Sequence, residues 1–264
     1  MTPTKKRNGR YLLFLDILGF SELVETMGAK EIYQIINKAL VAFKRWEDLN
    51  QQFSTIYFSD TFLFYQLSKG YKGERFLDIY AIGGRLLSAL LAQGIPARGV
   101  ISFGEFEVMD DQSGRHQLYF GRALIDAYKA EKCENWIGIT ILEAAYTLYE
   151  REYPDNIAYY ERDRVWKKRG DGVLLLNPFI KLHGWYESDI KGEVSKPYLN
   201  WDAPEFPNDI VGFKYLRDMA AGYANKGDFS GKVATKYHCT IAFLRDILGP
   251  EIFEWGIKIS EEVV

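Results

Sequence analysis

Two aspartates that stand within apolar runs constrain the fold of this chain more than any other feature. Asp16 lies in the apolar run 11–18, and Asp60 lies in the run 56–65. A carboxylate inside a buried strand is unfavourable unless it is paired or binds a metal ion. Either residue alone is typical of a salt-bridged core aspartate. The two together, in the sequence contexts described below, predict an acidic site that holds divalent cations beside phosphates.

The composition is that of an ordinary globular protein. The 264 residues are 47% hydrophobic and 26% charged, and the formal net charge is -3, which argues against a general nucleic-acid binder. The two cysteines, Cys133 and Cys239, are far apart, and the three histidines have no ligand spacing. The sequence therefore predicts no zinc cluster and indicates a reducing, cytoplasmic environment.

Nothing in the sequence predicts a signal peptide or a membrane span. The basic residues 5–7 precede an apolar run that Asp16 interrupts, and no small-residue cleavage site follows. No window reaches the roughly 20 apolar residues that a membrane helix requires. We expect a soluble protein without a membrane span.

Hydrophobic periodicity predicts alternating strands and helices up to about residue 151. Strands are expected at 10–18, 54–66 (two strands that turn near Ser59 and Asp60), 97–107, 117–118 and 136–140. Helices are expected at 29–46, 74–93, 121–134 and 141–151, with a short helix after Gly19 that Ser21 caps. This order predicts an α+β fold, in which helices pack over a mostly antiparallel sheet.

The pattern is weaker beyond about residue 155. Strands are expected at 157–160 and 172–176, a polar loop at 189–208, and helices at 209–225 and 231–248. We interpret 8–155 as the main domain and 156–264 as a C-terminal extension of strands and helices that packs on it or continues it. The segment 227–232 is one residue short of a phosphate-binding loop and follows no strand, so it predicts no such loop.

Residues 8–150 resemble the class III nucleotidyl cyclases. The run 14–21 is similar to the first metal motif of that family, and Ser59-Asp60 stands at the position of its Gly-Asp hairpin. The run 97–105 is similar to the central strand of the family, and 119–127 is similar to the glycine-started helix that follows. Four motifs in the right order make the resemblance specific. It implies a ferredoxin-like core.

The resemblance also implies a metal site. Two divalent ions, Mn²⁺ or Mg²⁺, would be held by Asp16, Asp60 and the carbonyl of Ile17, and they would promote cyclisation of a nucleoside triphosphate. The backbone amides from Leu18 through Gly19 to Phe20 lead into a helix N-terminus, where they would bind the departing phosphates.

A head-to-tail homodimer is implied as well, in which a helix of one subunit completes the site of the other. The transition-state arginine of the family corresponds to Lys129, and the ribose-binding asparagine corresponds to Ile125. Lysine keeps the charge but lacks the bidentate geometry of arginine, and isoleucine cannot hydrogen-bond a ribose. Arg98 and Arg122 are the candidates that could take over these contacts, and otherwise each is a solvated surface arginine or part of an ion pair at a strand edge.

Two positions bear on the choice of base. Ile56 and Leu118 stand where adenylate cyclases have a lysine and an aspartate, and where guanylate cyclases have a glutamate and a cysteine. Such apolar side chains give no polar readout of a purine edge. The neighbouring aromatic residues Tyr57, Phe58 and Phe120 favour the smaller pyrimidine ring.

This pattern resembles the bacterial pyrimidine cyclases of the Pycsar group, which act in anti-phage defence. The resemblance implies conversion of UTP, less often CTP, to the 3′,5′-cyclic nucleotide and pyrophosphate. The product would be a second messenger that activates a separate effector.

Two other functions stay open. One is an adenylate or guanylate cyclase with an unusual base pocket, and the other is a catalytically inactive cyclase-like module that binds a nucleotide. Ile125 and Lys129 favour the inactive module. The presence of both Asp16 and Asp60 favours the enzyme, because buried carboxylates without a function only cost stability.

Overall fold

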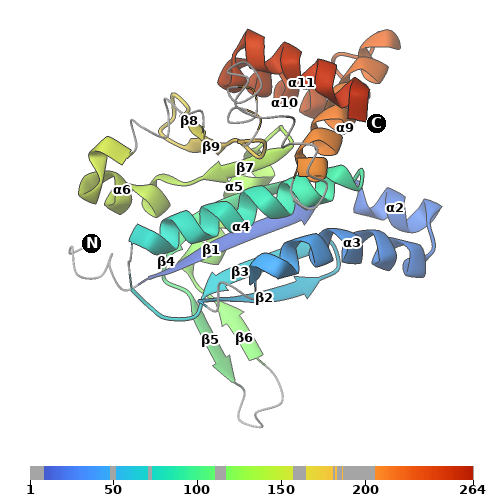
Figure 1. Cartoon of the computed structure of the whole chain (residues 1–264). Helices are drawn as coiled ribbons and strands as arrows, with labels where there is room; N and C mark the ends of the chain where they lie inside the picture. The colour runs from blue at the N-terminus through green and yellow to red at the C-terminus, as the bar shows by residue number, and fades with distance from the viewer. Residues whose placement is uncertain are drawn as a thin grey trace.

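A seven-stranded sheet forms the centre of the molecule (Figure 1). The computed structural model describes residues 9–47, 52–70, 73–110, 117–156, 165–180, 182, 186 and 206–263. In spatial order the strands are β2 (Phe53–Phe58), β3 (Thr61–Gln66), β1 (Arg10–Ile17), β4 (Ala97–Gly104), β7 (Gly138–Ile141), β9 (Leu174–Leu176) and β8 (Trp166–Lys168). Neighbouring strands are antiparallel, except that β4 and β7 are parallel. A separate hairpin is formed by β5 (Glu107–Asp110) and β6 (Gln117–Phe120).

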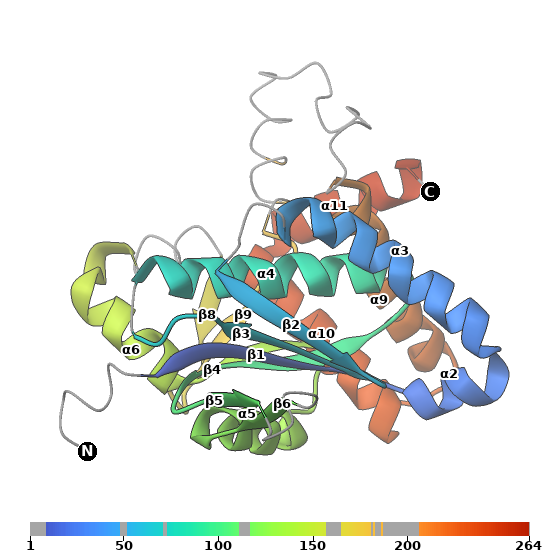
Figure 2. The same ribbon diagram turned by 90° about the horizontal axis from the view of Figure 1, so that it is seen from below.

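Helices cover both faces of this sheet. They are α2 (Phe20–Thr26), α3 (Ala29–Glu47), α4 (Gly73–Ala92), α5 (Arg122–Cys133), α6 (Glu143–Glu152), α9 (Phe206–Asn225), α10 (Lys232–Leu248) and α11 (Pro250–Val263). Figure 2 shows α3 and α4 on one face of the sheet, and α5 with the β5–β6 hairpin on the other. None of the described helices is long and apolar enough to cross a membrane.

Strand β1 is buried on both faces, which explains why its sequence does not alternate between apolar and polar residues. Leu13 and Leu15 belong to the large core on the α4 side, whereas Leu12 and Phe14 belong to the smaller core under α5. Successive side chains of a strand point to opposite faces. Asp16 is therefore the next side chain of β1 on the α5 side.

Small residues let α5 approach the sheet closely. Ala123 and Ala127 lie on the buried face of the helix, and Ser102 of β4 donates a hydrogen bond from its hydroxyl to the carbonyl of Ala123 (2.9 Å). Gly104 of β4 lies directly beneath Ala123. This contact fixes the position of α5 along β4.

A two-residue turn at Ser59 and Asp60 joins β2 to β3. Ser59 has φ 54°, and it is the one non-glycine residue in the described part of the chain with a positive φ. Such a conformation suits tight hairpins and costs a serine roughly 1–2 kcal/mol. The amide of Ile17 donates to the carbonyl of Asp60 (2.8 Å), which holds the turn against the end of β1.

The predicted α+β class is confirmed, with helices packed over a mostly antiparallel sheet and a C-terminal extension. The helices predicted at 29–46, 74–93, 121–134 and 141–151 are present, with ends within two residues of those expected.

Other predictions of local structure were wrong. The strand expected over 97–107 ends at Gly104, because the carbonyl of Glu105 turns away to accept the amide of Ala123 at the start of α5 (3.0 Å). Ser21 does not cap α2, since that helix begins at Phe20 with Gly19 as N-cap.

Around the C-terminal extension, β8 and α11 were not predicted, and α9 begins at Phe206, within the expected loop. The strand expected at 157–160 and the loop expected at 189–205 lie outside the described residues.

The residues after 164 share both the sheet and the core of the preceding part. The β8–β9 hairpin continues the sheet beyond β7, and α9 packs along α4. At that contact Ser88 of α4 hydrogen-bonds the buried carboxylate of Asp209. Helices α10 and α11 pack on α9, so all three form a group beyond the β7 side of the sheet (Figure 1).

Candidate functional site

Asp16 and Asp60 meet where β1 ends. Asp16 is the penultimate residue of β1, and the turn that carries Asp60 is tied to the next residue, Ile17, through its backbone. The hydroxyl of Thr61 lies 3.5 Å from Oδ1 of Asp16, at the outer limit of a hydrogen bond. Asp60 itself lies in the turn between β2 and β3, where the sequence predicted a turn.

The electrostatic environment of Asp16 disfavours its charge. Burial, followed by the negative charges of Asp60 and Glu131, raises the pKa of Asp16 from 3.8 to about 6. Lys132 and Arg98 act in the opposite direction. Burial and the neighbouring carboxylates together therefore outweigh the positive charges that act on Asp16.

Arg98 and Glu131 form a buried ion pair beside Asp16. Arg98 of β4 lies opposite Asp16 in the sheet, and Glu131 ends the buried face of α5. The Nε of Arg98 donates to Oε1 of Glu131 (2.7 Å), as does Nη2, while Nη1 donates to the carbonyl of Glu134. All three guanidinium nitrogens thus donate hydrogen bonds within the protein.

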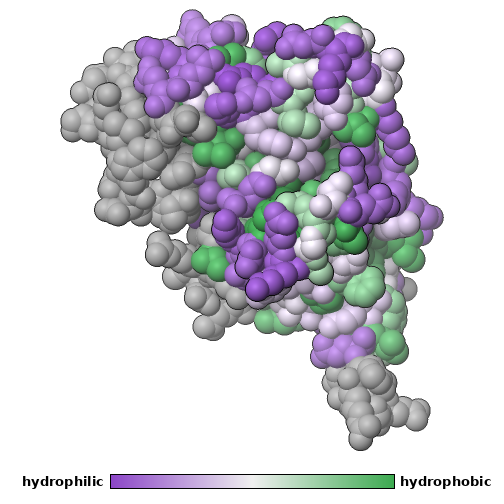
Figure 3. All heavy atoms as spheres, turned by 90° about the vertical axis from the view of Figure 1, so that its right-hand side faces the viewer, coloured by the Kyte–Doolittle hydropathy of each residue, from purple (hydrophilic) through white to green (hydrophobic). Residues whose placement is uncertain are grey.

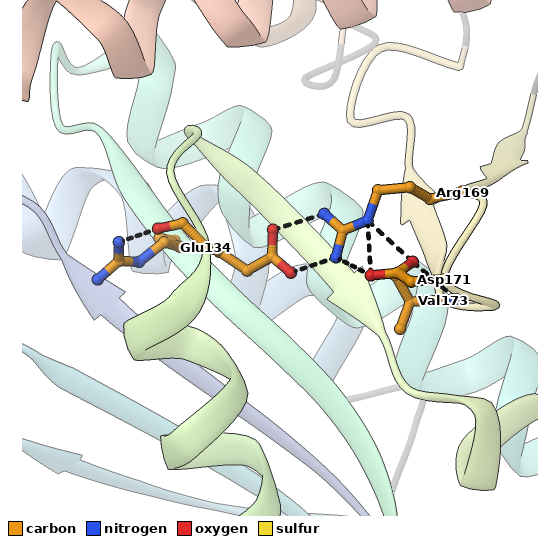
Figure 4. Close-up of polar contacts among 5 residues, drawn as sticks. Glu134, Arg169, Asp171 and Val173 are labelled. Carbon is orange, nitrogen blue, oxygen red and sulfur yellow. Dashed lines mark hydrogen bonds and ion pairs between the residues drawn. The ribbon is translucent and has the colours of Figure 1, made fainter.

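A second arginine extends this network to the C-terminal hairpin. Arg169 comes from the turn between β8 and β9, and its two Nη atoms donate to the two carboxylate oxygens of Glu134, both at 2.8 Å. Figure 4 shows Arg169 between Glu134 and Asp171, whose Oδ1 accepts from Nε of the arginine at 3.0 Å. The end of α5 is therefore held from both β4 and the β8–β9 turn.

The donor set at this site suits a divalent ion that also binds a phosphate. Within the described residues, no group of three or more His, Cys, Asp and Glu side chains is placed to hold a metal by itself. Mg²⁺ is commonly bound by only one or two carboxylates, together with substrate phosphates. Asp16, Asp60 and the Ile17 carbonyl match that chemistry, and a cation would favour the charged form of Asp16, which burial and the neighbouring carboxylates disfavour.

In the segment predicted to bind phosphates, Leu18 to Phe20, one backbone amide already donates a hydrogen bond within the fold. The amide of Leu18 donates to the carbonyl of Pro96 (2.9 Å), so it is used within the fold. Gly19 follows with φ 74°, and α2 begins at Phe20. The bend at Gly19 turns the chain away from the end of β1.

The three α5 positions singled out by the resemblance lie on the exposed side of that helix. Arg122, Ile125 and Lys129 are exposed and share one face, three and four residues apart. The Nε of Arg122 donates to both oxygens of Asp126 (2.8 and 2.9 Å). This face points away from the sheet, whereas the carboxylates of the same chain lie on the sheet side.

The two base-pocket positions lie in different surroundings. Ile56 of β2 is partly buried against the core under α5. Leu118 of β6 is 55% exposed, on the outer face of the hairpin. The structure does not pack these two side chains into one cluster.

Two residues of this region were not identified from the sequence. Glu131 continues the buried stripe of Ala123 and Ala127 at a spacing of four residues, and that spacing was the available signal. Lys236 of α10 lies within electrostatic range of Asp16 and Glu131. It carried no local signal, since only the tertiary fold brings α10 to this place.

The chain matches no family model and no curated protein. Solved structures similar to part of it include the adenylyl cyclase CyaB from P. aeruginosa, which is 17% identical, with 55% of this chain and 82% of that chain covered and a TM-score of 0.47. The guanylyl cyclase Cya2 is also 17% identical, with 53% and 78% covered and a TM-score of 0.46. The guanylate cyclase domain of RhGC from Catenaria anguillulae, solved in complex with GTP, is 14% identical, with 65% and 97% covered and a TM-score of 0.48.

Replacement of Asp16 by asparagine is expected to stabilise the metal-free protein above about pH 6. The folded-state pKa of Asp16 is raised from 3.8 to about 6, so the folded state binds more protons than the unfolded state between these values. The stability of the wild type therefore falls as pH rises through this window. The Asp16→Asn variant keeps its stability, because asparagine does not ionise. We expect a gain on the order of 1–2 kcal/mol near pH 7.5, and little difference near pH 4, in urea unfolding with EDTA.

The matched control is Asp155→Asn, which changes an exposed aspartate at the end of the helical turn after α6. It should unfold like the wild type at both pH values. A stability gain of Asp16→Asn that is equal near pH 4 and near pH 7.5 would contradict the electrostatic explanation.

Loss of Arg98 is expected to destabilise the fold strongly, because Glu131 would remain buried without its partner. Arg98→Met should lower the free energy of unfolding by about 3–5 kcal/mol, and the double variant Arg98→Met/Glu131→Met should recover most of it. Arg122→Met serves as the control and should leave the urea midpoint unchanged, since its side chain is exposed. If Arg98→Met and Arg122→Met lowered the free energy of unfolding equally, the ion pair between Arg98 and Glu131 would not be structural.

Proposed function

We propose that this chain is a metal-dependent nucleotide cyclase with a class III cyclase-like fold. It converts a pyrimidine nucleoside triphosphate, UTP in preference to CTP, to the 3′,5′-cyclic nucleotide and pyrophosphate. The observation that carries the proposal is the meeting of Asp16 and Asp60 beside buried Glu131, in surroundings that raise the pKa of Asp16. Carboxylates that repel one another in this way form a binding site for cations.

The site residues have separate tasks in this reaction. Asp16, Asp60 and the Ile17 carbonyl would hold divalent ions, which supply Lewis-acid stabilisation of phosphate charge and favour loss of the ribose 3′-hydroxyl proton. The buried pair of Arg98 and Glu131 fixes the sheet beside Asp16 and so positions its carboxylate. We assign Arg98 this positioning role in place of the direct phosphate contact considered from the sequence.

The pyrimidine preference rests on the apolar character of two positions. Ile56 is packed in an apolar cluster, and Leu118 is also apolar, so neither side chain can hydrogen-bond a purine edge. The aromatic rings of Tyr57 and Phe120, both exposed, border these strands and favour a smaller base. The resemblance to pyrimidine cyclases supports the same choice, together with a second-messenger role in bacterial anti-phage defence through a separate effector.

An apolar surface on the hairpin and α5 supports a homodimer. We call it the outer hairpin surface; it consists of Met109, Leu118, Phe120, Ile125 and Tyr128, each about half exposed. Met109 lies opposite Leu118 in the hairpin, and the residues that face the other way pack on the core under α5. Figure 3, which looks onto the side toward which β1 points, shows apolar atoms near the hairpin at lower right.

This surface adjoins the exposed face of α5 that carries Lys129, and that face points away from the carboxylates of its own chain. A head-to-tail pair of chains would bring the Lys129 of each subunit to the carboxylates of the other. Exposed apolar patches of this kind are typical of protein interfaces. We infer that the occupant of the outer hairpin surface is a second copy of this chain.

The proposed activity is tested by incubating the purified protein with each of the four ribonucleoside triphosphates and Mn²⁺ or Mg²⁺. We expect cyclic UMP as the main product, with less cyclic CMP, identified by mass spectrometry. Asp60→Ala should lower the rate at least about 100-fold while the fold survives, because the metal site loses one of its two carboxylates. Asp155→Ala, on the exposed surface, should retain the wild-type rate.

The other outcomes separate the alternatives. Cyclic AMP or cyclic GMP as the main product would contradict the pyrimidine preference and leave a purine cyclase. A folded dimer that binds a triphosphate but forms no cyclic product would favour the inactive module. Mn²⁺ binding, followed by electron paramagnetic resonance, should be lost in Asp60→Ala whether or not turnover occurs.

The head-to-tail dimer predicts that two inactive variants restore each other. Asp60→Ala and Lys129→Met should each be inactive alone, because each removes a group that every site needs. Mixed in equal amounts, they should regain about a quarter of wild-type activity, since half of the dimers then contain one intact site. Asp60→Ala mixed with Asp16→Ala should stay inactive, because both changes fall in the same half of the site. No recovery in the first mixture would contradict the shared site.

A further inference from the structure

Helix α10 is clamped onto the sheet next to the candidate site. The amide of Ile137, just before β7, donates to Oγ1 of Thr240 on α10 (2.8 Å), and that oxygen lies 3.2 Å from the Ile137 carbonyl. Thr240 is buried, and the rings of Trp136 and Phe243 pack edge to face beside it, with centroids 4.9 Å apart. The position of α10 along the sheet is therefore fixed by specific contacts.

This clamp lies at one end of a row of residues that crosses the sheet. Asp16 of β1 lies opposite Arg98 of β4, and Arg98 is in register with Gly138 of β7. Ile137, which contacts Thr240, immediately precedes Gly138. One turn before Thr240 on the helix is Lys236, whose side chain is brought toward Arg98 and Asp16.

Lys236 is not alone on this face of α10. Lys232 lies one turn earlier, and its positive charge, like that of Arg98, lowers the pKa of Lys236 after the larger effect of burial. Two lysines four residues apart on a helix repel each other, which costs an isolated helix a few tenths of a kcal/mol. Such an arrangement is favourable when an anion binds between the ammonium groups.

Neither lysine forms an ion pair with a described carboxylate, and the negative charges of Glu131 and Asp16 act on Lys236 only from a greater distance. Glu131 is already bonded to Arg98, and its other oxygen lies 3.5 Å from the ammonium of Lys132. Among the described residues, no carboxylate lies within ion-pair distance of Lys232 or Lys236. Once a divalent ion neutralises the carboxylates of the site, the two lysines remain as an uncompensated pair of positive charges beside it.

We propose that Lys232 and Lys236 bind the polyphosphate end of the triphosphate substrate held at Asp16 and Asp60 of the same chain. The inference rests on the proposed function, since it takes the substrate to be a nucleoside triphosphate. Phosphate oxygens supply the dense negative charge that a pair of ammonium groups prefers. The C-terminal helices thereby contribute substrate-binding residues and have more than a packing role.

The test measures binding of inorganic tripolyphosphate to the full chain by calorimetry, with excess Mg²⁺ and with orthophosphate as the comparison. Tripolyphosphate has no ribose or base, so base selectivity does not enter. We expect the wild type to bind tripolyphosphate well above orthophosphate. Lys236→Met should weaken this binding at least about tenfold and Lys232→Met several-fold. Lys258→Met, on the exposed surface of α11, should bind like the wild type.

Two further measurements separate this role from a structural one. The thermal unfolding midpoint of each ligand-free variant and its Mn²⁺ binding, read by electron paramagnetic resonance, should stay at wild-type values. A Lys236→Met protein that melts early and loses Mn²⁺ binding would show that Lys236 is a structural counter-ion, and would overturn the proposal. If the wild type forms cyclic nucleotides but both lysine variants bind tripolyphosphate as the wild type does, the lysine proposal is overturned and the proposed function stands. A wild type that binds neither UTP nor tripolyphosphate would overturn both.

Discussion

The buried ion pair between Arg98 and Glu131 is the contact on which the rest of the site depends. It joins the central strand β4 to the end of α5, directly beside Asp16, and Arg98 also bonds the carbonyl of Glu134. The carboxylate of Glu134 in turn accepts two hydrogen bonds from Arg169 of the β8–β9 turn. A pair of buried charges is a poor source of net stability, but removing one partner is costly. Its value here is positional, because it fixes α5, β4 and the C-terminal hairpin relative to Asp16.

Strands and helices up to residue 152 were largely predictable from the sequence, because each buries a face whose spacing appears in the residue pattern. Gly19 and the Ser59-Asp60 turn also marked the ends of elements correctly. Element ends set by tertiary hydrogen bonds were not predictable. The break after Gly104 depends on Ala123, which lies in another element, and no local signal announces it.

The candidate site shows the same division. Asp16 and Asp60 were found because a carboxylate among apolar residues is conspicuous. Glu131 was missed because a glutamate in a helix is usually exposed. Only its position on the buried face of α5, in contact with Arg98, distinguishes it. Lys236 could not be found at all from local sequence, since a sheet register and the Thr240 clamp together bring it to the site. Arg98 was singled out for its charge, and the structure shows it in an ion pair with Glu131, which was the alternative that the sequence also offered.

The β8–β9 hairpin has a consequence for how this protein can be divided. It pairs with β7 along Ile139, Thr140 and Ile141, which are all fully buried. A fragment that stopped near residue 155 would leave β7 as an open sheet edge, with unpaired backbone groups and an apolar surface. Edges of this kind recruit other strands and lead to aggregation. In physical terms the boundary suggested by sequence resemblance is therefore not a folding boundary, and the part of the chain without recognisable motifs protects the part that has them.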